Sequence, residues 1–288
     1  MKLDYATLIS PQSLYLQDIG HIIPPKLEHI WNPNITYQGY KVFLSLLLVD
    51  LQQYCEKINV QKYKWYVTLP PKEVSNYNMF DIFLDDESLR NQYEKLLNFF
   101  FEETVKWDTE NCVFAVYTKS VIKETEYVNR KYNIFQKLLI KLGFLKLETH
   151  DVEVNKNDII GVIHKEIWNE LCDIILQMCG IDRSKNSEKK IKFKNKIAKE
   201  VWEILHEDEN KDNDTDNELP NIISAIAAKH LSLNITNIWE LTVYQLYDQF
   251  RRLQINSYYD ISSMSVAAYG DSEGNFNGKA WYQNIYEN

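Results

Sequence analysis

One acidic stretch of the sequence places three aspartates at alternate positions, which is how the carboxylates of a calcium-binding loop are spaced. These residues are Asp212, Asp214 and Asp216. An EF-hand loop also requires a glycine at its sixth position and a glutamate at its twelfth, because the chain must turn sharply and the last ligand must bind through two oxygens. Asn217 and Ile223 occupy those two positions. The sequence therefore predicts no calcium site here.

The signatures of zinc, nucleophile and phosphate chemistry are also incomplete. His164 and Glu166 form the H-x-E of a zinc deaminase, but no P-C-x-x-C follows to supply the remaining ligands. The sequence contains no HExxH, no GxSxG and no P-loop pattern. The cysteines are far apart, without zinc-binding spacing, which fits a reduced, intracellular environment. They are Cys55, Cys112, Cys172 and Cys179, of which the last two are predicted to face the core. We predict no catalytic residue, no metal and no cofactor.

An intracellular metal-dependent enzyme such as a nuclease is the alternative to this prediction. Glu188 and Lys190 provide the E-x-K half of a nuclease pattern, and dispersed carboxylates such as Asp81, Asp85 and Glu102 would have to complete the site. Such triplets are common in a chain in which 25% of the residues are charged, so a solvated helix surface is the simpler interpretation. The net charge of −9 also argues against binding to nucleic acid, which requires a basic face.

The composition favours contacts with other proteins. The 288 residues include 19 tyrosines and 7 tryptophans but only 8 glycines. Tyrosine combines an apolar ring with a polar tip and is enriched at protein interfaces. The most apolar run, VFLSLLLV at 42–49, is too short to cross a bilayer, and the N-terminus lacks the pattern of a signal peptide. We therefore expect protein partners, with no role for nucleic acid or membrane.

The elements that would position any site are mainly helices. Apolar residues that recur every three or four positions predict helices, whereas alternating patterns predict strands. Helices are expected at 37–58, 89–107, 132–144 and 159–180, and strands at 62–69 and 112–119. The sequence thus predicts an α+β fold that is predominantly α-helical with a minor β-sheet.

Five regions are predicted along the chain. Prolines rule out one long helix at the N-terminus, and thirteen consecutive residues without an apolar side chain predict a solvated loop. The regions are an extended arm at 1–34, a helical α+β domain at 35–183, a charged helix at 184–205, an acidic flexible loop at 206–218 and a C-terminal helical domain at 219–288.

The stretch WELTVYQLYDQFRRL, which begins at Trp239, contains the candidate binding residues. Asn237 is predicted to cap its helix, with Glu240 reaching back toward the cap. One apolar seam is assigned to the core and consists of Trp239, Val243, Leu246, Phe250 and Leu253. Beside this seam lie tyrosines and arginines, which are the residue types that binding interfaces favour. The predicted partner-binding stripe consists of Tyr244, Tyr247, Arg251 and Arg252.

Several parts of the sequence resemble uncharacterised virion or tail-assembly proteins of tailed phages of low-GC Gram-positive bacteria. They are NIISAIAAKHLSLNITNIWELTVYQLYDQFRRL, SMSVAAYGD and WYQNIY in the C-terminal region, and ISPQSLYLQDI and TYQGYKVFLSLLL near the N-terminus. The resemblance implies a tail or baseplate component, or a tail-assembly chaperone, that works without catalysis. Its partners would be other phage tail proteins or further copies of itself, in the host cytoplasm or in the virion.

Overall fold

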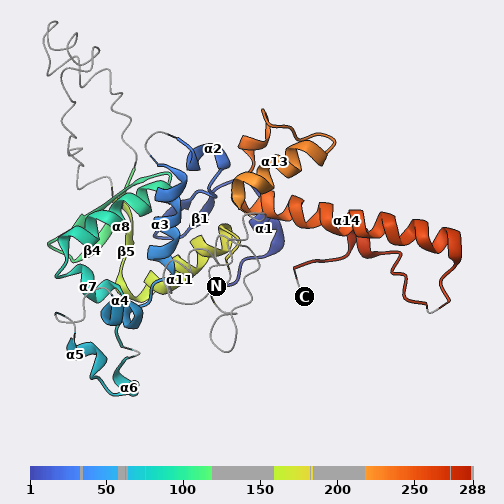
Figure 1. The fold of residues 1–288 in the computed structure, drawn as a ribbon. Helices are drawn as coiled ribbons and strands as arrows, with labels where there is room; N and C mark the ends of the chain where they lie inside the picture. The colour runs from blue at the N-terminus through green and yellow to red at the C-terminus, as the bar shows by residue number, and fades with distance from the viewer. Residues whose placement is uncertain are drawn as a thin grey trace, which may run out of the picture.

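The computed structural model of the chain describes residues 1–32, 35–57, 62, 64–74, 76–118, 159–181, 183, 218–272 and 274–286. Among these residues the fold is α+β and predominantly helical, with two small sheets, as predicted (Figure 1). None of the helices described is both long and apolar enough to span a membrane. The predictions for 132–144, for the charged helix and for the acidic loop up to residue 217 lie outside the described residues.

The larger sheet has three antiparallel strands in the order β3 (Thr104–Asp108), β4 (Val113–Tyr117) and β5 (Ile159–Ile163). β4 confirms the strand predicted at 112–119. The prediction of one helix over 159–180 is wrong at its start, because IIGVI pairs with β4 as β5 and the helix α11 (Lys165–Met178) begins only after His164. Similarly, the helix predicted at 89–107 ends at Phe100, and β3 occupies its last residues.

The core helices adjoin this sheet through α8 (Glu87–Phe100), which packs against β3. They are α3 (Tyr37–Leu48), α4 (Leu51–Lys57), α7 (Phe80–Phe83), α8 and α11. The single helix predicted at 37–58 is two helices, because Val49 adopts an extended conformation. The next residue, Asp50, accepts a hydrogen bond from the backbone N–H of Gln53 at 2.8 Å, which favours the start of a new helix.

The prediction of a strand at 62–69 is wrong. The segment forms the short helix α5 (Lys64–Val67), and α6 (Pro71–Val74) follows it. Alternation does not separate an inner from an outer face here, since Trp65 and Val67 are 46% and 49% exposed and Tyr66 is the buried residue. The double proline starts a helix, for which its fixed φ is already suited, rather than ending a strand.

Aromatic rings fill the centre of the core. Trp168 of α11 is 2% exposed and its ring lies within 6.0 Å of the rings of Phe83, Tyr93 and Phe114, measured between centroids. Phe80 of α7 contacts the same tryptophan at 5.9 Å. This cluster joins α7, α8, the sheet and α11 into one core.

Residues 1–32, predicted as part of an extended arm, contain α1 (Tyr5–Ile9), a hairpin of β1 (Leu14–Leu16) and β2 (Gly20–Ile22), and α2 (Leu27–Ile30). They are packed into the core: Ile22, Leu27 and Ile30 are fully buried. The backbone N–H of Leu3 also donates to the side-chain oxygen of Gln177 on α11 at 2.9 Å. The N-terminal residues are thus an integral part of the fold.

The C-terminal part consists of α13 (Leu219–Lys229), a short helix η4 (Ile238–Glu240), the 27-residue helix α14 (Val243–Tyr269) and η5 (Ala280–Tyr282). The cap predicted at Asn237 is wrong. Thr242 caps α14 in a capping box with Gln245, because Leu241 is extended and separates η4 from α14. Figure 1 shows α14 extending well beyond the end of α13, with the C-terminal tail turning back beside it.

Candidate functional site

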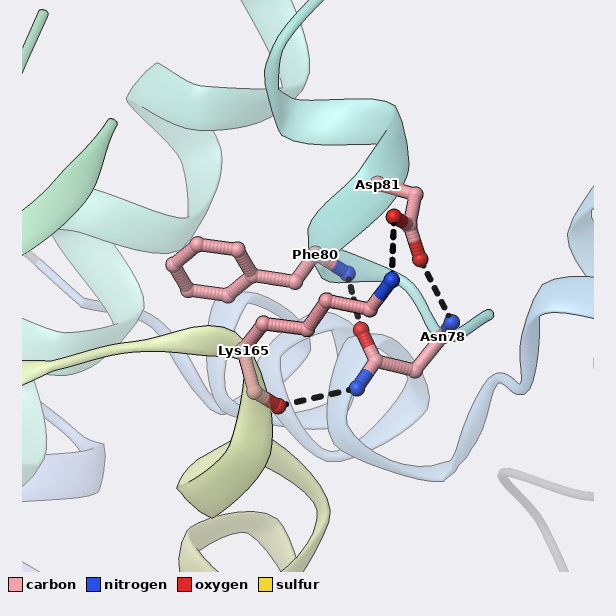
Figure 2. Close-up of polar contacts among 4 residues, drawn as sticks. All are labelled: Asn78, Phe80, Asp81 and Lys165. Atoms are coloured by element: carbon pink, nitrogen blue, oxygen red, sulfur yellow. Dashed lines mark hydrogen bonds and ion pairs between the residues drawn. The ribbon is translucent and has the colours of Figure 1, made fainter. Parts of the chain in front are cut away.

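The carboxylates named for the alternative metal-dependent enzyme are not brought together. Asp81 forms an ion pair with Lys165, with 2.6 Å between Oδ1 and Nζ, and accepts a hydrogen bond from the backbone N–H of Asn78 at 2.8 Å (Figure 2). Asp85 and Glu102 are exposed. Within the described ranges, no group of three or more His, Cys, Asp or Glu residues could hold a metal ion.

The contacts around Asn78 join two elements of the core. Its Nδ2 donates to the backbone oxygen of Lys165 at 2.9 Å, and its Oδ1 accepts from the backbone N–H of Phe80 at 2.9 Å (Figure 2). The ammonium group of Lys165 also lies 5.2 Å from the centre of the Tyr77 ring. These contacts hold the start of α7 against the start of α11. The ion pair of Asp81 and Lys165 therefore stabilises the packing of these two helices.

A cavity of about 230 Å³ lies next to this junction. Its walls combine apolar side chains with the buried thiol of Cys172 and five charged or amide residues, which are Asp50, Gln52, Asn78, Asn169 and Arg183. Sites for small molecules usually enclose about 300–1,000 Å³. Arg183 is already paired with Asp173, at 3.2 Å from its Nη1 to Oδ1. The cavity is therefore smaller than a typical ligand site.

The cysteines predicted to face the core do so. Cys172 and Cys179 are 3% and 1% exposed, and burial raises the pKa of each thiol to about 12. A thiol with so high a pKa is a poor nucleophile and a poor metal ligand at neutral pH. The H-x-E residues, His164 and Glu166, form an exposed pair with 2.6 Å between Nδ1 and Oε2.

Glu103 and His21 form a partly buried contact that was not predicted from the sequence. The Glu103 carboxylate is 8% exposed, lies 2.6 Å from Nδ1 of His21, and accepts a hydrogen bond from the His21 backbone N–H at 3.0 Å. The pair attaches β2 to the residue that precedes β3. Because 82 positions separate the two residues, no local pattern announces the contact.

A cluster of polar aromatic and charged residues surrounds Asp248 on α14. We call Tyr5, Tyr244, Asp248, Arg252 and Tyr286 the Asp248 cluster. The Asp248 side chain is 7% exposed and accepts hydrogen bonds from the hydroxyl groups of Tyr5, at 3.2 Å, and Tyr286. The rings of Tyr5 and Tyr286 stack with their centroids 3.9 Å apart. The cluster thus fastens both ends of the chain to α14.

Contacts within this cluster bury part of the predicted partner-binding stripe. Tyr244 is only 8% exposed, because the ring of Tyr286 stacks on it with 5.9 Å between centroids. Tyr247 is partly buried against the core, and Arg251 and Arg252 are half-buried. Nη1 of Arg252 donates to the backbone oxygen of Gln283 at 2.9 Å. The C-terminal tail (residues 274–286) therefore covers part of the stripe.

The predicted core seam is buried to different depths. Val243 and Leu246 are fully buried, whereas Phe250 and Leu253 are partly buried against the core. Trp239 also packs there, but from η4 rather than from α14. All five side chains therefore contribute to the packing of the C-terminal part.

The most exposed part of α14 is its second half, residues 254–269, which we call the distal segment. It contains a single charged residue, Asp260. Four of its large side chains face solvent: Tyr258 is 74% exposed, Ile261 66%, Met264 64% and Tyr269 90%. Solvated helices usually carry many charges, whereas interfaces are depleted of them and enriched in tyrosine and methionine. The distal segment is therefore the candidate interaction site.

Asp248 gives the C-terminal part a pH-dependent stability. Burial raises the pKa of Asp248 above its ordinary value of 3.8. The folded state therefore holds this proton more tightly than the unfolded state, so the stability from protonation is complete below pH 3.8 and is lost as the pH rises through the folded-state pKa. We expect Asp248→Asn to gain stability relative to the unmodified chain as the pH rises from 4 to 7. Urea unfolding across this range measures the difference, and a constant difference contradicts the prediction.

One of the comparisons with known proteins concerns the same region. Residues 209–286, about a quarter of the chain, match the family model described as the YomV second domain, and YomV is a protein of the SPbeta phage region of Bacillus. An "Uncharacterized membrane protein" of Plasmodium falciparum (isolate 3D7) is 25% identical over 171 residues, which cover 58% of this chain. The match spans 5% of that protein's length, so it carries no argument about activity.

No solved structure is significantly similar to the chain. The matched family region contains α13, η4, α14 and η5, and therefore the whole distal segment and most of the Asp248 cluster. The match is consistent with a phage-related protein of low-GC Gram-positive bacteria.

Proposed function

We propose that the chain works through protein–protein contacts, as a component of a phage tail or baseplate or as a chaperone of tail assembly. The observation that carries the proposal is the distal segment of α14, a solvent-exposed helix of sixteen residues with one charge. Most of the stability of a helix in a protein comes from packing of its apolar face, so a partner that covers the exposed apolar side chains would stabilise this segment. The family match to a phage protein over the same residues points in the same direction.

The contact that this helix can make is apolar rather than ionic. Tyr258, Ile261 and Met264 are spaced three residues apart, so they lie along neighbouring turns of one side. Buried aromatic and apolar anchors supply most of the binding energy in interfaces, and each commonly contributes more than about 1 kcal/mol. A carboxylate at Ile261 would be buried against the partner without a counter-ion.

Particle assembly tests the proposal. In cells that produce the phage, we expect Ile261→Asp to reduce the yield of complete tails at least tenfold, since a loss of about 1.4 kcal/mol already weakens an association tenfold. The matched control is Leu231→Asp, because Leu231 is fully exposed and lies outside α14. Electron microscopy of particles and sedimentation of the tagged chain with tail proteins measure the effect. Normal tails from Ile261→Asp, or an unmodified chain that never sediments with tail proteins, would contradict the proposal.

A further inference from the structure

The apolar seam of α14 continues beyond the part that the chain itself covers. In the first half of the helix the seam steps through Val243, Leu246, Phe250 and Leu253. The same steps of three and four residues lead on through Ser257, Ile261, Met264 and Ala268. With 3.6 residues per turn, such steps keep all these side chains on one side of the helix. The exposed side of the distal segment is therefore the continuation of a core face.

The helix α13 covers the seam only as far as Ser257. In the first half α13 packs against α14, with Ile222, Ile223 and Ile226 buried. The last residue of α13, Lys229, donates through Nζ to the hydroxyl oxygen of Ser257 at 2.5 Å. Beyond that point Ile261 and Met264 are 66% and 64% exposed. A helix that continued the line of α13 would cover them.

The C-terminal tail does not supply this cover. Phe276 of the tail lies against the ring of Tyr259, with 5.6 Å between centroids. Tyr259 is two positions from Ile261, which on an α-helix separates the two side chains by about 200°. The tail therefore packs against the side of α14 that lies opposite the exposed seam.

The exposed seam is also suited to pairing with itself. Asp260 is the one charged residue of the distal segment, and it stands about 100° from Ile261, at the edge of the seam. Two copies of a chain with a net charge of −9 can therefore approach along this side without placing like charges face to face. Charged residues at an interface commonly select one particular partner, and the exposed seam has none. Symmetric pairing requires only that the surface be complementary to itself.

We propose that a second copy of the chain covers the seam, with the two distal segments packed antiparallel about a two-fold axis between Ile261 and Ser265. This arrangement places the large Tyr258 of each copy opposite the small Ala268 of the other, whereas parallel pairing would oppose two tyrosines. It also brings the tip of the partner's helix level with Ser257, where α13 ends. The inference rests on the protein-contact function proposed above and names one partner of the same helix.

The dimer is expected to be weak. The distal segment is about 24 Å long, since an α-helix rises 1.5 Å per residue. One side of such a helix offers less than the roughly 800 Å² per partner of a standard interface. We therefore expect a dissociation constant on the order of micromolar.

Sedimentation equilibrium of the purified full-length chain tests the association. Between about 1 and 200 μM, a range that brackets a micromolar dissociation constant, the mass should rise from 34.2 kDa toward twice that value. Ile261→Asp should raise the dissociation constant at least tenfold, whereas Leu231→Asp should leave it unchanged. Both positions are exposed, and matching urea midpoints of the two variants would show that folding is intact. A mass of 34.2 kDa at every concentration, or unaltered association of Ile261→Asp, would overturn the proposal.

Cross-linking tests the direction of pairing. In a background with the exposed Cys112 changed to serine, the double variant Tyr258→Cys with Ala268→Cys should form a dimer with a short bismaleimide. Tyr258→Cys alone should not, because in the antiparallel dimer its counterpart lies ten residues away along the helix. Efficient cross-linking of that single variant would instead indicate parallel pairing and refute the two-fold arrangement. If the chain dimerises but Ile261→Asp leaves tails normal, the tail function is refuted and the dimer is not. If the chain is monomeric but Ile261→Asp impairs tails, the dimer is refuted and the tail function is not.

Discussion

Replacing Trp168 by alanine is expected to lower the free energy of unfolding by about 3–5 kcal/mol, the usual cost of truncating a large buried aromatic residue. The ring is 2% exposed and contacts aromatic rings from α7, α8 and β4. None of these neighbours can move into the space without breaking its own contacts, because the others hold it in place. The cavity would therefore remain largely unfilled, and its walls would lose their dispersion contacts.

Urea unfolding followed by circular dichroism measures this change. The matched control is Trp281→Ala on η5, because Trp281 is 52% exposed. Changes at such surface positions usually stay within about 0.5 kcal/mol. Equal effects of the two substitutions would show that the ring cluster around Trp168 is not the centre of the core.

The second large effect is expected at Gly161 on β5. A Cβ atom there would lie 2.5 Å from the backbone oxygen of Ile19 and 2.8 Å from that of Asp18. These are backbone atoms in the turn of the β1–β2 hairpin, and the Asp18 oxygen also accepts a hydrogen bond from the N–H of Val162 at 3.0 Å. Gly161→Ala should therefore force the hairpin away from β5 and destabilise the fold by about 1–3 kcal/mol.

Gly39 provides the control for this substitution. An added Cβ at Gly39 in α3 would meet Oγ1 of Thr36 at 3.7 Å, an ordinary contact. Alanine in a helix avoids the entropic cost of glycine, so Gly39→Ala should be neutral or stabilise by up to about 1 kcal/mol. Differential scanning calorimetry compares the two melting temperatures. A Gly161→Ala chain that melts with the unmodified one would show that the hairpin adjusts without cost.

The fold class could be predicted from the sequence because helical periodicity is a local signal. Helical periodicity gave wrong predictions where a locally helical pattern belongs to a segment that pairs with a distant strand. IIGVI has the apolar density of a helix, but its β-branched residues pair with β4, and the pairing partner lies more than forty residues earlier. At 62–69 the alternation was genuine, yet Trp65 and Val67 are exposed, so it marks no buried face.

The candidate site was predictable only in part. Periodicity predicts an apolar seam that includes Val243 and Leu246, and both side chains are fully buried. It also assigned Tyr244 to the surface, where it would lie if nothing covered it. Tyr286 covers it, and no feature of the sequence near Tyr244 shows where the end of the chain will fold. The exposed distal segment was recognisable from its lack of charge, but only the structure shows that α13 stops at Ser257.

The attachment of both chain ends to α14 has a consequence for synthesis on the ribosome. Tyr5 and Asp248 are separated by 243 positions, so at roughly 5–20 residues per second the partner of Tyr5 emerges on the order of 10–50 s later. Similarly, the backbone N–H of Leu3 cannot donate to Gln177 until that residue has been synthesised. During this interval the apolar side chains of Ile22, Leu27 and Ile30 lack part of the surface that finally buries them. The nascent chain should therefore expose these side chains, and depend on chaperones that shield them, until the residues around Asp248 have been synthesised.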